Sequence, residues 1–162
     1  MHSQKNLKRK PVVAIIGRGE CTVEEAAKVS ETTKILAQNG VIILCGGLGG
    51  TMEAAAKGAK EAGGQTIGII PGTNKEKASP YIDFVISSGM GEARNVLIVR
   101  SADVVIAFPG KYGTLSEIAF ALVEKKPVIS VGSWDVGEEI IKADSPTHAA
   151  QLALEIVKED NR

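Results

Sequence analysis

Short apolar runs alternate with helical segments along most of this chain. The runs are rich in β-branched residues and most of them end near a glycine or a proline, as strands do. They predict strands over residues 12–16, 41–45, 65–70, 82–86, 104–108 and 127–131. Apolar residues at helical spacing predict helices over residues 22–38, 52–62, 92–101, 115–122 and 146–158. Because strands that alternate with helices form a mainly parallel sheet covered on both faces, the sequence predicts a doubly wound α/β fold with three layers.

Size and charge limit the classes of protein to which the chain can belong. Its 162 residues suit one domain, which we expect over residues 11–162, behind a disordered basic tail over residues 1–10. Lysine plus arginine and aspartate plus glutamate each total 19, and a net charge of zero argues against a nucleic-acid or membrane-surface partner. The start lacks a signal-peptide core and no apolar run approaches the ~20 residues that span a membrane, so we expect a cytoplasmic protein. Two histidines and two cysteines, without a C-x-x-C motif, argue against a metal site.

The strongest functional signal is the loop between the strand at 104–108 and the helix that follows it. This loop contains Pro109, Gly110, Lys111, Tyr112, Gly113 and Thr114. A glycine-rich loop at a helix start aims free backbone N–H groups and the positive end of the helix dipole at one point, which suits a phosphate. Glu117 lies about one turn inside the helix, where its carboxyl group can face the bound group. The alternatives are that Glu117 only stabilises its own helix, that Lys111 is solvated, and that Tyr112 packs instead of stacking on a base.

Three further loops follow strand ends and therefore belong to the same edge of the sheet. Gly17 and Gly19 follow the first strand, where a glycine pair either contacts a ligand or only makes a tight turn. The second loop is richer in glycine, which favours close backbone approach to a ligand over a flexible connection, and it contains Gly46, Gly47, Gly49, Gly50 and Thr51.

The third loop contains Met90 and leads into a helix with Arg94 in its first turn. A cation gains nothing from the helix dipole at that position, so Arg94 either binds an outside anion or forms a surface salt bridge. We include both Met90 and Arg94 among the candidate site residues.

Together these loops resemble a known superfamily. Residues 109–117 are similar to the P-G-G-x-G-T-x-x-E signature of the Lonely Guy family, long mislabelled as lysine decarboxylases, with Lys111 in place of the second glycine. The resemblance covers about residues 12–131 and implies a Rossmann-like fold. The family's activity is that of a phosphoribohydrolase, which cuts the N-glycosidic bond of cytokinin nucleoside monophosphates or AMP. Arg94 and Glu117 fall where the family has its catalytic arginine and glutamate.

Two details make the chain more similar to the molybdenum cofactor carrier branch of this superfamily. The enzymes usually carry Arg-Lys where this chain has Arg94 and Asn95, and residues 89–95 and the compact length look like the carriers. The resemblance implies that the chain binds an AMP-like nucleotide or molybdopterin at the carboxyl edge of the sheet and requires no cofactor for catalysis. The alternative is a phosphoribohydrolase. Lysine decarboxylation is rejected because it generally needs a cofactor such as PLP on a lysine Schiff base.

Four apolar residues stand in succession in the predicted helix over residues 92–101: Val96, Leu97, Ile98 and Val99. This apolar band is wider than packing on one sheet face requires. We therefore expect a homo-oligomer, a dimer or a tetramer, that forms through this helix.

Overall fold

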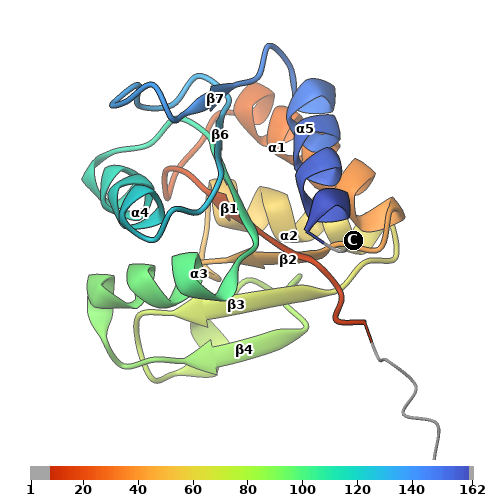
Figure 1. The fold of residues 1–162 in the computed structure, drawn as a ribbon. Helices are drawn as coiled ribbons and strands as arrows, with labels where there is room; N and C mark the ends of the chain where they lie inside the picture. The colour runs from red at the N-terminus through yellow and green to blue at the C-terminus, as the bar shows by residue number, and fades with distance from the viewer. Residues whose placement is uncertain (1–7, 161–162) are drawn as a thin grey trace, which may run out of the picture.

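A computed structural model describes residues 8–160 (Figure 1). Within them the strands are β1 (Val12–Ile16), β2 (Ile42–Cys45), β3 (Thr66–Ile70), β4 (Phe84–Ser87), β5 (Val104–Ala107), β6 (Val128–Ser130) and β7 (Ile141–Lys142). The α-helices are α1 (Val23–Gln38), α2 (Thr51–Glu61), α3 (Asn95–Ser101), α4 (Tyr112–Val123) and α5 (Pro146–Glu159). Two short 3₁₀ helices are η1 (Lys75–Lys77) and η2 (Gly91–Arg94).

The strands form one parallel sheet in the order β4-β3-β2-β1-β5-β6-β7. The chain moves outward from β1 to β4 and then returns to place β5 on the other side of β1. The topological switch point therefore lies between β1 and β5. In open α/β sheets, ligands bind outside the carboxyl ends of the strands at this point.

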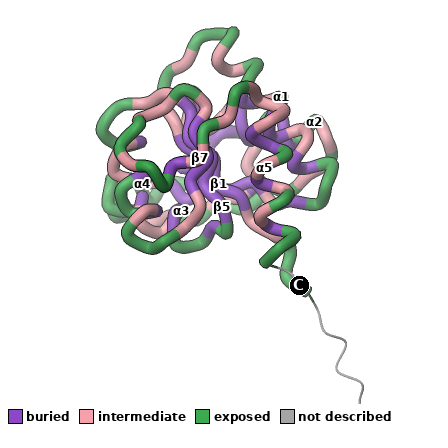
Figure 2. Tube along the Cα trace, turned by 45° about the horizontal axis from the view of Figure 1, so that its top comes forward, coloured by how far each residue is buried: buried purple, intermediate pink, exposed green. Residues whose placement is uncertain are grey.

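Two apolar cores lie on opposite faces of the sheet. Alternate residues of β1 point to opposite faces, so Val13 and Ile15 join one core while Ala14 and Ile16 join the other. The first core packs against α1, α2 and α5, and the second packs against α3 and α4. Figure 2 shows the buried strands between these two groups of helices. The prediction of a doubly wound α/β fold with three layers is confirmed.

Several element boundaries differ from those predicted. The strand β7 was not predicted, because its two residues are too short to show an apolar pattern. The helix expected over residues 92–101 begins instead as the 3₁₀ turn η2, which follows Gly89 and starts at Gly91, both with positive φ. Of the residues 92–101, only those of α3 (Asn95–Ser101) are α-helical. In α3, Ile98 and Val99 are buried on the sheet, while Val96 and Leu97 are half-buried.

The ends of the chain are described only in part. The tail expected over residues 1–10 lies mostly outside the described residues. Residues 8–10 are exposed and have no regular secondary structure, and Nζ of Lys10 donates a hydrogen bond to Oε1 of Gln65 at 3.1 Å. No helix between residues 8 and 160 is long and apolar enough to cross a membrane.

Candidate functional site

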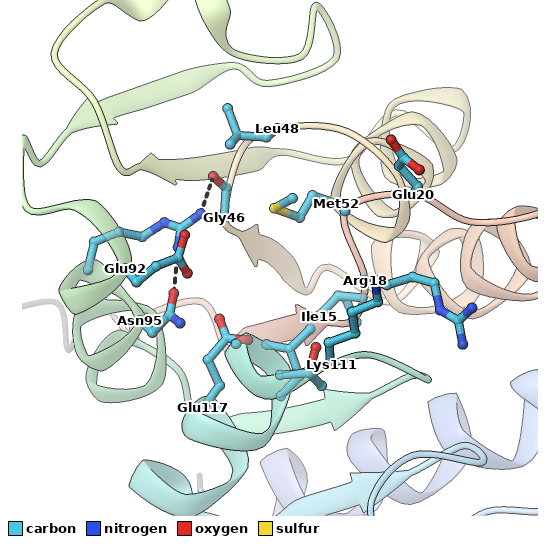
Figure 3. A pocket seen from close by; sticks show the side chains of 16 residues that line it. Ile15, Arg18, Glu20, Gly46, Leu48, Met52, Glu92, Asn95, Lys111 and Glu117 are labelled. Carbon is cyan, nitrogen blue, oxygen red and sulfur yellow. Dashed lines mark hydrogen bonds and ion pairs between the residues drawn. The ribbon is translucent and has the colours of Figure 1, made fainter.

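A cavity of about 560 Å³ opens at the switch point (Figure 3). Its walls come from the segments after β1, β2 and β5 and from η2 and α3. The cavity brings together eight of the residues predicted from the sequence: Gly17, Gly19, Gly46, Arg94, Lys111, Gly113, Thr114 and Glu117. These residues are separated by up to 100 positions in the chain, and the sheet topology brings them to one edge.

The start of helix α4 reaches this cavity without a side-chain cap. Its N-cap residue is Lys111, and Gly113 and Thr114 of its first turn line the cavity. Helices α1 and α5 differ, because the side chains of Thr22 and Ser145 cap them. The first N–H groups of a helix have no partner within it, so an uncapped start that faces a cavity presents donors and a positive dipole to an anion. The geometry of α4 therefore suits a phosphate.

Arg94 is buried and is held by backbone oxygens. Its Nε donates to the carbonyl oxygen of Ile69 at 2.7 Å, and its Nη2 donates to that of Gly46 at 3.4 Å. Its Nη1 donates to Oδ1 of Asn95 and lies 3.7 Å from Oε2 of Glu92. These contacts fix the plane of the guanidinium, and the remaining N–H groups are available to an acceptor in the cavity.

Glu117 lines the same cavity and is only 7% exposed. Burial raises the pKa of its carboxyl group to about 8, although the Arg94 guanidinium lowers it and the Glu92 carboxylate raises it. Within residues 8–160 no side chain donates a hydrogen bond to this carboxyl group that would hold it as a carboxylate. Figure 3 shows the carboxyl group of Glu117 pointing into the cavity. At neutral pH Glu117 is therefore mainly a neutral acid that faces the site.

Several predicted residues pack the loops closely against one another, and two of them, Gly50 and Thr51, do not line the cavity. The N-cap of α2 is Gly50, which has φ +60 and leaves no room for a Cβ beside the backbone of Gly19. A Cβ on Gly17 would lie 2.6 Å from Oγ1 of Thr51, a buried residue whose N–H donates to the carbonyl oxygen of Arg18 at 3.0 Å. These contacts join the loops after β1 and β2, so Gly50 and Thr51 shape the site from outside it.

The remaining predicted residues also lie outside the cavity lining. Gly47 has φ +77 and packs on Ile70, Gly49 packs on Gly19, and Met90 is exposed at the start of η2. Pro109 accepts a hydrogen bond from the backbone N–H of Arg18.

Gly110 and Tyr112 contact Trp134 instead of the cavity. Nε1 of Trp134 donates to the carbonyl oxygen of Gly110 at 3.0 Å. The rings of Tyr112 and Trp134 stack with centroids 6.3 Å apart, and Tyr112 is exposed. Tyr112 therefore packs on another aromatic ring, and stacking on a base stays a prediction.

Sequence reasoning missed several residues of the cavity wall. Arg18 and Glu20 line the cavity and are direct sequence neighbours of the predicted Gly17 and Gly19. Their position in the same loop was the sequence signal that could have identified them. Arg18 points toward α1, where its Nη1 lies 3.6 Å from Oε1 of Glu25. Leu48, Met52, Glu92 and Asn95 also line the cavity. Within the part of the chain that the structure describes, no group of three or more His, Cys, Asp or Glu side chains is arranged to hold a metal ion.

Comparison with known proteins agrees with this fold. The molybdenum cofactor binding protein of Rippkaea orientalis superposes with a TM-score of 0.87 and 37% identity, over 92% of this chain and 98% of its own. The Moco carrier protein of Chlamydomonas reinhardtii superposes with a TM-score of 0.85 and 32% identity, over 93% of this chain and 99% of its own.

An enzyme is also similar in sequence. A cytokinin riboside 5'-monophosphate phosphoribohydrolase of Arabidopsis thaliana is 31% identical over 105 residues, which are 63% of this chain and 45% of the enzyme. The match therefore spans less than half the length of that relative. The family model of the SLOG cluster4 family matches residues 10–160. The chain therefore belongs to the SLOG cluster4 family, within the Lonely Guy superfamily and near its molybdenum cofactor carrier branch.

Proposed function

We propose that this protein binds a small phosphorylated, nucleotide-like molecule in the cavity, as a carrier of molybdenum cofactor does. The observation that carries the proposal is the convergence of the uncapped start of α4 with the buried guanidinium of Arg94 on one cavity. Backbone donors and a fixed cation together suit a terminal phosphate. The similarity to a molybdenum cofactor binding protein over nearly the whole chain supports a pterin phosphate as the ligand.

In this proposal the phosphate sits at the start of α4. It accepts hydrogen bonds from the N–H groups of Gly113 and Thr114, while Lys111 adds a mobile cation at the mouth. Arg94 neutralises part of the negative charge from the opposite wall. The organic part of the ligand then extends along Leu48 and Met52, which supply the apolar surface of the same cavity. Small-molecule sites commonly combine such apolar walls with a few placed polar groups.

Calorimetric titration with AMP and with molybdopterin tests this proposal. The purified protein should bind at least one of them, and Lys111→Ala should weaken that binding because it removes a cation from the phosphate end. Lys158→Ala is the matched control, since Lys158 is an exposed lysine in the last turn of α5, on the far side of the sheet. A protein that binds neither compound would contradict the proposal.

A second candidate function is hydrolysis of the N-glycosidic bond of AMP or a cytokinin nucleoside monophosphate. The observation that favours it is Glu117, a buried carboxyl group that points into the cavity near Arg94. Glycoside cleavage passes through an oxocarbenium-like transition state, and a carboxylate beside the anomeric carbon stabilises its positive charge. The similarity to a phosphoribohydrolase over 63% of the chain supports this candidate.

Chromatography of the products after incubation with AMP separates the two functions. A hydrolase releases adenine and ribose 5-phosphate, and Glu117→Gln should abolish that release because an amide carries no negative charge. Intact AMP together with measurable binding supports the carrier function. Release by Glu117→Gln at the wild-type rate would contradict the proposed catalytic role of Glu117.

A further inference from the structure

The side chain of Glu92 lies where an anion would be expected to bind. Its Oε2 is 3.7 Å from Nη1 of Arg94. The same oxygen would lie 3.6 Å from a Cβ placed on Gly113, so the carboxylate also adjoins the first turn of α4. Figure 3 shows the side chain of Glu92 at the cavity wall, with its carboxyl group facing the open space. The protein's own carboxylate thus sits between the two groups that suit a phosphate.

Glu92 is not needed to hold Arg94 in position. Three hydrogen bonds already fix the guanidinium: to the carbonyl oxygens of Ile69 and Gly46 and to Oδ1 of Asn95. The separation of 3.7 Å from Glu92 exceeds a hydrogen bond, so that contact is only Coulombic. The Glu92 side chain is 80% exposed, whereas that of Arg94 is 6% exposed. The buried partner is therefore fixed, and the exposed one is free to leave.

The backbone around Glu92 is held in place, because the N–H groups of Gly89 and Gly91 donate to the carbonyl oxygens of Gly72 at 3.1 Å and Pro71 at 2.9 Å, so the freedom at this position belongs to the Glu92 side chain. Gly89 and Gly91 both adopt positive φ, and η2 is a single 3₁₀ turn without a side-chain cap. Apart from Arg94, no cation within residues 8–160 forms an ion pair with Glu92. A rotation of this side chain toward solvent breaks no hydrogen bond of the described chain.

We infer that Glu92 is a built-in competitor for the anionic group of the ligand, which must displace this carboxylate to reach Arg94 and the start of α4. The inference rests on the proposed function, since it concerns the ligand of the same cavity. It makes Glu92 a determinant of affinity and of ligand class. A phosphate forms charge-assisted hydrogen bonds with Arg94 and with the start of α4, and these bonds stabilise the complex enough to displace the carboxylate. An uncharged nucleoside forms no such bonds at this position.

Titration of AMP and of adenosine into wild type, Glu92→Gln and Glu20→Gln at fixed ionic strength tests the inference. Glu92→Gln should bind AMP about fivefold more tightly than wild type, because the charge that competes for Arg94 is gone. Its affinity for adenosine should not change. Glu20→Gln is the matched control, since it removes one negative charge from the wall of the same cavity without touching Arg94, and it should give a clearly smaller gain.

The outcomes separate this inference from the function on which it rests. Equal gains for both variants would show a general field effect and would overturn the inference. The inference would also be overturned if wild type binds AMP and Glu92→Gln binds it equally well or more weakly. In that case the proposed ligand class would stand. Absence of AMP binding by all three proteins would overturn the inference, and the absence of molybdopterin binding as well would overturn the proposed function. A structure of the AMP complex supplies a second readout, in which the phosphate should replace the Glu92 carboxylate beside Arg94.

Discussion

Nδ2 of Asn95 donates a hydrogen bond to Oγ of Ser116 across 3.1 Å, and this contact joins α3 to α4. The same amide accepts from Nη1 of Arg94 through its Oδ1. Ser116 in turn donates to the carbonyl oxygen of Gly113 at 2.7 Å. A chain of hydrogen bonds therefore runs from the buried guanidinium to the first turn of the helix that suits the phosphate. The amide of Asn95 therefore links the two halves of the candidate site.

Replacing Asn95 with alanine should weaken AMP binding about tenfold, because hydrogen bonds to charged groups contribute roughly 1.5–3 kcal/mol and the buried Arg94 loses one of its three. Calorimetric titration measures the change. Ser116→Ala is the control, since it cuts only the second link and leaves Asn95 beside Arg94, so its effect should be smaller. Wild-type affinity in Asn95→Ala would contradict a role for the amide in positioning Arg94.

Replacing Glu117 with glutamine should stabilise the protein increasingly as the pH rises. The pKa of Glu117 is raised from 4.5 to about 8 in the folded chain, so between these values only the folded state keeps the proton. Stability then falls as pH rises through that window, because the unfolded chain releases the proton that the folded chain keeps. Glutamine does not titrate, so the difference in melting temperature should grow in its favour from about pH 5 to about pH 9.

A second glutamate provides the control for this pH series. The pKa of Glu61 is lowered, mainly by its hydrogen bond with Lys34, so this exposed carboxyl group has finished titrating below the window. The difference in melting temperature between Glu61→Gln and wild type should therefore stay constant across this pH window. A constant difference for Glu117→Gln as well would show that Glu117 is ionised in the folded protein at neutral pH.

If the protein cleaves AMP, the rate should rise with pH around the pKa of Glu117, about 8. Stabilising an oxocarbenium-like charge requires the ionised carboxylate, and the protonated form predominates below that pH. Initial rates of adenine release from about pH 6 to about pH 10 measure the profile. A rate that falls over this range would instead assign Glu117 the role of a general acid.

Replacing Gly110 with alanine should destabilise the fold by about 1–3 kcal/mol, because the new Cβ would overlap Oγ1 of the buried Thr114. Chemical denaturation measures the loss. Gly19→Ala is a matched control in the same site, since no atom lies within 4 Å of its added Cβ and Gly19 lacks positive φ. Equal stability of the two variants would mean that the loop relaxes around Gly110.

The sequence predicts a homo-oligomer that forms through the helix with Val96 and Leu97. Because the structure buries Ile98 and Val99 of that helix on the sheet, we expect the contact at the edge strand β4 instead. Phe84 and Ile86 are 54% and 48% exposed, and they pair with Ile67 and Ile69, which belong to the core on the α3 and α4 face. Figure 1 shows β4 at the outer edge of the sheet. An exposed apolar patch of this kind marks an interaction surface, and we expect a second copy of the chain to cover it.

Light scattering tests this expectation at micromolar protein. Wild type should have the mass of a dimer or a tetramer, and the double change Phe84→Lys and Ile86→Lys should lower it because buried charge would disfavour the contact. Val23→Lys is the control, since Val23 is exposed on α1, on the other side of the sheet. A monomeric wild type would refute the oligomer, and an unchanged mass for the double variant would place its interface elsewhere.

Local patterns were sufficient to predict the order of the five α-helices and of strands β1 to β6 among the described residues. The continuous apolar character of Val104–Ala107 reflects burial on both faces, which the sheet confirms. The apolar pattern did not predict β7, because two residues are too few to show a period. It also predicted an α-helical turn where the chain forms the 3₁₀ turn η2, which starts at Gly91. Glycine spacing also did not separate residues that line the cavity, such as Gly113, from those that pack loops together, such as Gly50.

The sequence by itself determined the fold class, the family and the loops that reach the site, because periodicity, β-branching and glycine content act over a few neighbouring residues. Only the tertiary structure decided which loops meet, since the return of the chain from β4 to β5 brings Arg94 and Glu117 to one cavity. It also decided the charge of the site. The proton on Glu117 and the place of Glu92 beside Arg94 depend on burial and Coulomb interactions between segments distant in the chain, which no local pattern encodes.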